Sequence, residues 1–281
     1  MAHETGHIYT AASPLRAPRR FLASALYDLR VVPVAGTRLF VRNLQSKYRQ
    51  SALQWAWIVV PPLITTLTWV FLNHAGVIKN KGINMPYAAY VGSGACGFQL
   101  FIESLTAPMN ELHQATEVLK HARLPHESWV FAGVLLALFT FVVRMVVLLP
   151  VLVLLGSLGG TTLLLVPLGA IGIALLGTGL GLLLAIPGRL FTDVPQALQV
   201  VTGLLFFLTP VFYARPKHGF VGHVLGFNPI TPSVITTRAW LTGTSGGLPV
   251  PFAITSGVGL TLLLIAWLSY RVAQPHLVAR L

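Results

Sequence analysis

Apolar residues in this chain gather into long runs, and polar segments separate the runs. A transmembrane helix needs about 20 consecutive, mostly apolar residues. By this rule the sequence predicts six membrane spans, which we place at residues 55–73, 87–106, 129–149, 163–186, 197–213 and 252–270. The expected fold is an all-α integral membrane protein whose six-span domain covers residues 55–271.

The segment before the first span mixes apolar and basic positions. Within residues 37–54, leucine, valine, phenylalanine and tyrosine side chains alternate with four cations, namely Arg38, Arg42, Lys47 and Arg49. A helix of this composition lies in the membrane interface, with its cations among anionic headgroups. We therefore predict an amphipathic interfacial helix that leads directly into the first span. Residues 1–36 and 272–281 are expected to be terminal tails.

Two connections between spans are longer than a turn requires. In residues 107–128, apolar positions share one helical face and predict a short separate helix that Pro125 ends. Residues 214–251 are rich in glycine and proline, yet they carry many large apolar side chains. This second pattern predicts short re-entrant helices that dip back into the membrane before the last span. A plain extracellular cap is the alternative.

The composition agrees with a membrane protein. The chain is 54% hydrophobic and 9% charged, with a mean hydropathy of +0.74, whereas soluble domains are about 25% charged. The net charge of +12 would suggest a nucleic-acid partner, but eight of the nineteen Lys and Arg residues precede Trp55. That placement indicates a membrane surface rather than nucleic acid. Cys96 is the single cysteine, and the nine histidines show no metal-binding spacing, so we expect no disulfide framework and no metal site.

The distribution of cations predicts the orientation of the chain, because Lys and Arg favour cytoplasmic loops. With the N-terminus inside, the inner segments hold thirteen Lys and Arg residues and the outer segments hold five. We therefore expect both termini and the short helix between spans two and three to be cytoplasmic.

Several short motifs, taken in order, resemble one protein family. They are the Lys47–Leu53 run before Trp57, Arg123-Leu124-Pro125, Thr192-Asp193-Val194, Thr209–Tyr213, and Asn228-Pro229 with Arg238. From about Arg38 to the C-terminus, the chain resembles the permeases of type-2 ATP-binding-cassette exporters. The resemblance is to the branch that exports lipid-linked polysaccharides such as O-antigen, teichoic acid and capsule.

This resemblance implies partners and a location. The chain has no Gly-Lys-Ser/Thr sequence and so no Walker A loop. ATP and Mg would therefore be bound by a separate ATPase, with two copies joining a permease homodimer in the cytoplasmic (inner) membrane of a bacterium. The helix between spans two and three would be the coupling helix in the ATPase groove, with polar contacts from Glu111, Glu117, Lys120 and Arg123. The interfacial residues Arg38, Arg42, Lys47, Tyr48 and Arg49 would lie near the diphosphate of a polyprenyl-linked substrate.

Two ionisable residues fall inside predicted spans, where such residues are usually functional. Glu103 lies about 5 Å, and Arg144 about 22 Å, from the inner ends of their spans at 1.5 Å per residue. From these depths we do not expect a direct pair. Arg144 either faces the transport pathway or extends its guanidinium towards the outer interface.

Aromatic residues concentrate in spans one, two and five. Together with Arg144, eight are candidates to line a glycan channel, namely Trp69, Phe71, Phe98, Phe101, Phe206, Phe207, Phe212 and Tyr213. The alternative is an aromatic belt at the interfaces. Gly177, Gly179 and Gly181 imitate a dinucleotide-binding loop, but their position inside a span favours close helix packing.

The sequence thus predicts a permease subunit that moves a lipid-linked polysaccharide with energy from a partner ATPase. An exporter of drugs or small lipids would have a narrower, less aromatic pathway. A membrane-embedded enzyme of lipid metabolism would need paired acids or an Asp-rich metal motif, which Glu103 and Asp193 alone do not supply. A secondary transporter would normally show internal repeats, and we find none.

Overall fold

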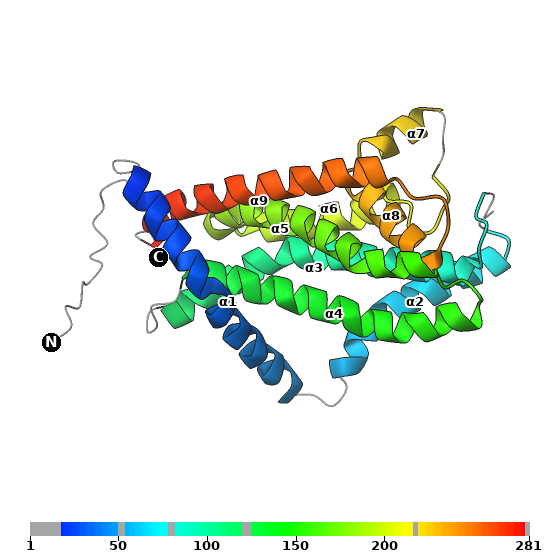
Figure 1. Ribbon diagram of the computed structural model, residues 1–281, viewed down its shortest axis with the longest axis horizontal. Coiled ribbons are helices and arrows are strands. Elements are labelled where there is room, and N and C mark those ends of the chain that lie inside the picture. Colours follow the sequence, from blue (N-terminus) through cyan, green and yellow to red (C-terminus); the bar gives the residue numbers. More distant parts are fainter. Residues whose placement is uncertain (1–17, 50–53, 78–81, 120–124, 216–218, 279–281) are drawn as a thin grey trace.

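The computed structural model describes residues 18–49, 54–77, 82–119, 125–215 and 219–278, and all regular structure in these ranges is helical. The elements are α1 Pro18–Arg49, α2 Gln54–His74, α3 Tyr87–Leu119, α4 His126–Leu154, the 3-10 helix η2 Thr161–Leu165, α5 Val166–Leu190, α6 Asp193–Leu208, α7 Gly219–Gly226, α8 Ile230–Thr242 and α9 Pro249–Val278. The long helices α3, α4, α5 and α9 run along the longest dimension of the molecule, and α1 crosses them at the end where the chain terminates (Figure 1).

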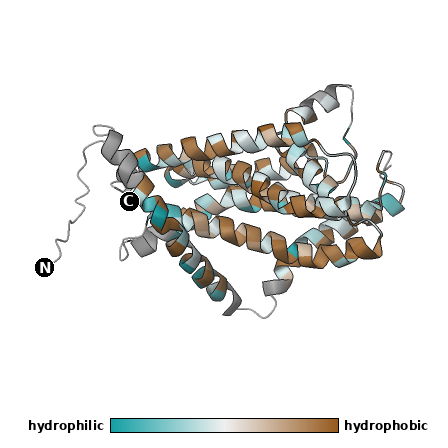
Figure 2. Ribbon diagram, in the orientation of Figure 1, coloured by the Kyte–Doolittle hydropathy of each residue, from teal (hydrophilic) through white to brown (hydrophobic). Residues whose placement is uncertain are grey.

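Four helices in the described ranges are long and apolar enough to cross a membrane. They cover Ala56–His74, His126–Leu154, Thr161–Leu190 and Pro249–Ala273. Figure 2 shows hydrophobic residues over the length of α4, α5 and α9 and hydrophilic positions along α1. The all-helical, multi-pass membrane character predicted from the sequence is confirmed. Two further helices differ from these four: α3 carries more polar residues than they do, and α6 is apolar but has only 16 residues.

The centre of the bundle is α5, which packs against α3 on one side and α9 on the other through glycines. A Cβ atom on Gly181 would lie 2.1 Å from the Leu105 carbonyl oxygen of α3, and one on Gly177 would lie 2.9 Å from that of Phe101. On the other side, a Cβ atom on Gly179 would lie 2.8 Å from the Gly259 carbonyl oxygen of α9. The predicted role of these glycines in close helix packing is confirmed.

Two helices run further than the hydropathy pattern indicates. α1 begins at Pro18 rather than at residue 37 and passes through Pro33 without a break. α3 continues through Pro108 to Leu119, so the expectation of a separate helix after span two is wrong. Tertiary packing accounts for both extensions, because α1 packs on α4 and the extension of α3 buries Leu112 between α5 and α9.

The last third of the chain contains the short helices expected before the final span. α6 ends at Leu208 rather than continuing to residue 213, because Thr209 precedes Pro210 and takes an extended conformation, with φ −105° and ψ 132°. α8 is almost entirely buried and contacts α3, α5, α9 and η2. The predicted short helices are confirmed, while their insertion into a membrane stays a prediction.

Candidate functional site

A cavity of about 690 Å³ lies between α2, α3, α4 and the α5–α6 connection. We call it the Glu103 cavity. Its wall combines the apolar side chains of Trp57, Ile58 and Leu136 with several polar ones, among them Glu103, Thr106, Asn110, Gln114, Thr140, Arg144 and Arg189. A large cavity with a few polar groups among apolar helices is the usual form of a binding site.

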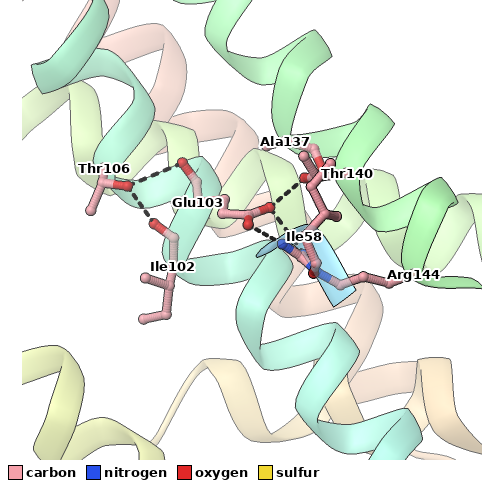
Figure 3. Close-up of polar contacts among 7 residues, drawn as sticks. All are labelled: Ile58, Ile102, Glu103, Thr106, Ala137, Thr140 and Arg144. Atoms are coloured by element: carbon pink, nitrogen blue, oxygen red, sulfur yellow. Dashed lines mark hydrogen bonds and ion pairs between the residues drawn. The ribbon is translucent and has the colours of Figure 1, made fainter. Parts of the chain in front are cut away.

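An ion pair between α3 and α4 forms one wall of this cavity (Figure 3). Arg144 Nη1 donates to Glu103 Oε2 at 3.1 Å, and Arg144 Nη2 pairs with Glu103 Oε1. The Thr140 hydroxyl donates to Glu103 Oε2 at 2.6 Å. The Arg144 side chain is 4% exposed and that of Glu103 is 25% exposed. The guanidinium is therefore buried, while the carboxylate is partly exposed, and both groups line the cavity.

The expectation that Glu103 and Arg144 do not pair is wrong, because it placed the end of span two too early. Glu103 lies 16 residues before the end of α3 at Leu119, and Arg144 lies 18 residues after the start of α4 at His126. At 1.5 Å per residue these distances are about 24 Å and 27 Å. The two residues are at the same level of an antiparallel helix pair.

Arg144 also contacts α2 at its proline pair. The Nε atom of Arg144 donates to the Ile58 carbonyl oxygen at 3.1 Å. In an unbroken helix the amide of residue 62 would donate to this oxygen, but Pro62 has no N–H group. The sequence indicates that Pro61 and Pro62 break the helix unless neighbours satisfy the freed carbonyls, and Arg144 is such a neighbour.

Seven of the eight predicted channel aromatics form one cluster. The Trp69 and Phe212 rings stack with centroids 3.8 Å apart, and Phe206 lies 5.3 Å from Phe98 and 5.7 Å from Phe212. Phe101, Phe207 and Tyr213 extend the cluster through Phe98, Phe206 and Phe212. Phe71 is two residues after Trp69 on α2, and the residue is 70% exposed. Two residues are about 200° apart around a helix, so Phe71 belongs to another face.

Phe212 owes its position to side chains that hold the backbone after α6. The buried Arg238 of α8 lies 3.7 Å from the Tyr90 ring centroid and donates to the Pro210 and Val211 carbonyl oxygens. The hydroxyls of Tyr87 and Tyr90 donate to the carbonyl oxygens of Phe212 and Tyr213, at 2.7 Å and 2.8 Å. Residues from α3 and α8 thus satisfy carbonyl oxygens of the irregular segment that follows α6, where no helix supplies a donor.

This arrangement was not predicted from the sequence, although one signal for it is present. Tyr87 and Tyr90 are three residues apart and therefore share one helix face. Asn228 completes the arrangement, since its amide donates to the Leu208 carbonyl oxygen and the Thr209 hydroxyl, each at 3.0 Å. The carbonyl oxygens that accept from Tyr87 and Tyr90 are about 120 residues further along the chain. No local sequence pattern indicates contacts over such a separation.

The predicted interfacial residues lie on α1. Arg38 and Arg42 are exposed, and the Arg42 guanidinium lies 5.0 Å from the Trp129 ring centroid of α4. Lys47, Tyr48 and Arg49 belong to the last turn of α1, and their side chains lie outside the described residues. Their predicted contact with a substrate headgroup is not tested by the geometry.

The predicted coupling residues are described only in part. Glu111 lies on α3, is 6% exposed, and accepts a hydrogen bond from the Asn43 amide of α1 at 3.0 Å. The Glu117 side chain and all of Lys120 and Arg123 lie outside the described residues. Glu111 thus has a partner within the chain, and its contact with an ATPase stays a prediction.

A second charged cluster, which the sequence reasoning missed, joins three helices at the end of the bundle where α1 crosses. Arg271 of α9 pairs with Asp28 of α1 and with Glu127 of α4. The Trp267 indole N–H also donates to Glu127 at 3.0 Å. These contacts fix α1 against the bundle and complement the packing of Leu39 on Trp129.

Comparisons with known proteins agree with this architecture. The model of the family described as ABC-2 type transporter matches residues 37–241. An O-antigen export system permease protein RfbA from Klebsiella pneumoniae is 22% identical over 262 residues, which are 89% of this chain and 95% of that protein. A second Klebsiella pneumoniae protein of the same description is 21% identical over 218 residues, 76% of this chain and 80% of that protein. Since the family match spans most of the chain, including α2, α3 and α4 around the Glu103 cavity, the chain belongs to the ABC-2 type transporter family.

Proposed function

We propose that this chain is the permease subunit of an exporter that moves a lipid-linked polysaccharide across the cytoplasmic membrane of a bacterium. The observation that carries the proposal is the similarity to O-antigen export permeases over 89% of the chain. The Glu103 cavity and the aromatic cluster support it, because a glycan is bound by polar groups and by stacking of its C–H faces on aromatic rings.

The proposed topology has six spans and cytoplasmic termini. α3 and α6 would be the spans that complete the four long apolar helices. α3 is the less apolar because its polar residues face α4 and the cavity rather than lipid. The Lys and Arg residues before Trp55 would lie at the inner membrane surface, where the substrate's diphosphate is presented.

The proposed assembly is a homodimer with two ATPase subunits that bind ATP and Mg. Apolar side chains of α2 and α6 are exposed in the single chain, among them Ile64, Leu67, Val200, Leu204 and Phe207. In a homodimer, α2 of one copy and α6 of the other would form the walls of the pathway. The end of α3 and the connection after it would contact the ATPase. Movement of the ATPase would then be transmitted through α3 to the Glu103 cavity.

The decisive experiment is reconstitution of the permease with its partner ATPase in proteoliposomes that contain a polyprenyl-diphosphate-linked glycan. We expect ATP-dependent movement of the glycan across the bilayer, and no movement with an ATPase variant that lacks its Walker A lysine. Lipid-linked O-antigen, teichoic acid and capsule precursors, compared in parallel, would identify the substrate class. Transport of a drug or a small lipid with no transport of any glycan would refute the proposal.

The aromatic cluster provides a sharper prediction. A Trp69→Ala variant removes the ring that stacks on Phe212 and should reduce glycan export by about threefold to tenfold, since aromatic pairs contribute about 0.5–1.5 kcal/mol. Phe71→Ala is the comparison on the same helix, because Phe71 is 70% exposed and lies on the face of Ile64 and Leu67, outside the aromatic cluster. In the proposed homodimer that face would line the pathway, so this variant measures the loss of an aromatic pathway contact that does not belong to the cluster. Export is measured as surface glycan per unit of folded permease. Equal losses in the two variants would contradict a special role for the cluster.

A further inference from the structure

α2 is attached to the rest of the protein at few points. Only 6% of the residues in its apolar window, Ala56–His74, are buried, against 56% for the window that includes α5. Besides its packing along α3 and α4, two specific contacts hold α2: Trp69 stacks on Phe212, and Arg144 donates to the Ile58 carbonyl oxygen. The two points are 11 residues apart, which is about 16 Å along the helix.

The hydrogen bond from Arg144 replaces one that the helix itself cannot make. The carbonyl oxygen of residue 58 would accept from the amide of residue 62, and Pro62 has none. A carbonyl that loses its helix partner inside a membrane span is costly unless another donor satisfies it. A donor from another helix at this position therefore fixes α2 at the place where its own hydrogen-bond ladder is interrupted.

Arg144 serves this role because Glu103 neutralises its charge. The two Nη atoms of Arg144 face the carboxylate of Glu103, which leaves the Nε–H group free to point at Ile58. The planar guanidinium presents its donors in a rigid fork, so pairing with Glu103 also sets the direction of the Nε–H bond. Thr140, one turn before Arg144 on α4, also donates to Glu103 Oε2 (Figure 3).

We propose that Arg144 and Glu103 are positioning residues that act as one latch on α2, and that the latch sets the position of the cavity wall made by Trp57 and Ile58. The latch is built into the wall of the Glu103 cavity, so in the proposed function the segment it fixes is one that the transported molecule would pass. With the latch intact, the first half of α2 rests on α3 and α4. With the latch removed, that half loses its hydrogen bond to α4 and keeps only its packing on α3 and α4. The transport consequence rests on the proposed function, whereas the structural consequence does not.

The test uses hydrogen–deuterium exchange of the full-length chain in lipid nanodiscs. The double variant Glu103→Leu/Arg144→Met removes both charges together, so neither is left buried alone. We expect exchange in the first half of α2 to become at least about tenfold faster, as the loss of a hydrogen bond from a charged donor implies. Exchange in α9 should stay unchanged and serves as the internal control. Unchanged exchange in α2 would overturn the proposal.

A proline substitution distinguishes the latch from general stabilisation. Adding Pro62→Ala to the double variant supplies the missing amide to the Ile58 carbonyl oxygen and should return exchange in α2 to within about threefold of the original rate. Pro61→Ala is the matched control, because its new amide would face the carbonyl oxygen of residue 57. Equal rescue by the two substitutions, or rescue by neither, would overturn the proposal.

A third variant guards against misfolding. Arg144→Lys keeps a positive charge opposite Glu103 but lacks the planar guanidinium with its Nε–H donor. Exchange should therefore become faster in the first half of α2 and stay unchanged in α9. Glycan export should follow the exchange results, with loss in the double variant and recovery with Pro62→Ala. Exchange that recovers without recovery of export would refute the transport role of the latch. Failure of the unaltered protein to export any glycan would instead refute the proposed function.

Discussion

A Glu103→Leu variant is expected to lose about 3–5 kcal/mol of stability, because it leaves the Arg144 guanidinium buried without a counter-charge. Arg144 is 4% exposed and pairs with no other acidic residue among the described residues, so no side chain there replaces the lost counter-charge. The free energy of unfolding can be measured by denaturant titration in detergent micelles or nanodiscs. Combining Glu103→Leu with Arg144→Met should recover most of the loss, since replacement of a buried pair by apolar residues is often close to neutral.

Thr140→Val is the matched control for this prediction. It removes one hydrogen bond to Glu103 but leaves the ion pair in place, and it should cost about 1 kcal/mol. If Glu103→Leu were no more destabilising than Thr140→Val, the pair would not be buried from solvent as the structure has it. If the Glu103→Leu/Arg144→Met variant were less stable than Glu103→Leu alone, this too would contradict the burial of the ion pair.

The helices of this chain were predictable because each has a strong local signal. Runs of apolar residues identified α2, α4, α5 and α9, and the glycines at 177 and 181 indicated where helices approach closely. The ends of helices were less predictable, because tertiary contacts extend them beyond the apolar run. α3 passes Thr106, where its apolar pattern ends, since Glu111 and Leu112 are buried against neighbouring helices.

That uncertainty about helix ends explains why the central ion pair was missed. The depth of Glu103 was counted from residue 106, and the actual end at Leu119 moves it to the level of Arg144. The identity of both residues as unusual intramembrane charges was evident from the sequence, and only their relation was not. Depth in a membrane is a tertiary quantity, and it cannot be read from a span whose end is uncertain.

The aromatic cluster illustrates the opposite case. Composition alone singled out Trp69, Phe98, Phe206 and Phe212, and the structure brings them together. What composition could not provide is the reason Phe212 faces Trp69. That reason is the set of hydrogen bonds to the backbone after α6 from Tyr87, Tyr90 and Arg238, and these contacts join segments distant in the sequence.

A Gly181→Val variant should separate α3 from α5 and cost about 3 kcal/mol or more, the upper range for overpacking a tight core. The nearest atom to an added Cβ is the Leu105 carbonyl oxygen at 2.1 Å, followed by the carbonyl carbon of Leu105 at 2.9 Å. These are backbone atoms within a helix, so no side-chain rotation relieves the overlap and the helices themselves must move. Because α3 carries Glu103, the same displacement should weaken the ion pair and slow export.

The matched control is Gly257→Ala on α9, where an added Cβ has no neighbour within 4 Å. There the change should stabilise the helix by about 0.5–1 kcal/mol, because glycine is a poor helix former. Both variants are compared by thermal unfolding in the same nanodiscs. A Gly181→Val protein as stable as Gly257→Ala would mean that α3 and α5 are not in backbone contact. Gly181 contacts α3 at Leu105, which lies on a different face of that helix from Glu103. If Gly181→Val lowered the unfolding temperature and Glu103→Leu did not, the α3–α5 contact would stabilise the bundle independently of the ion pair.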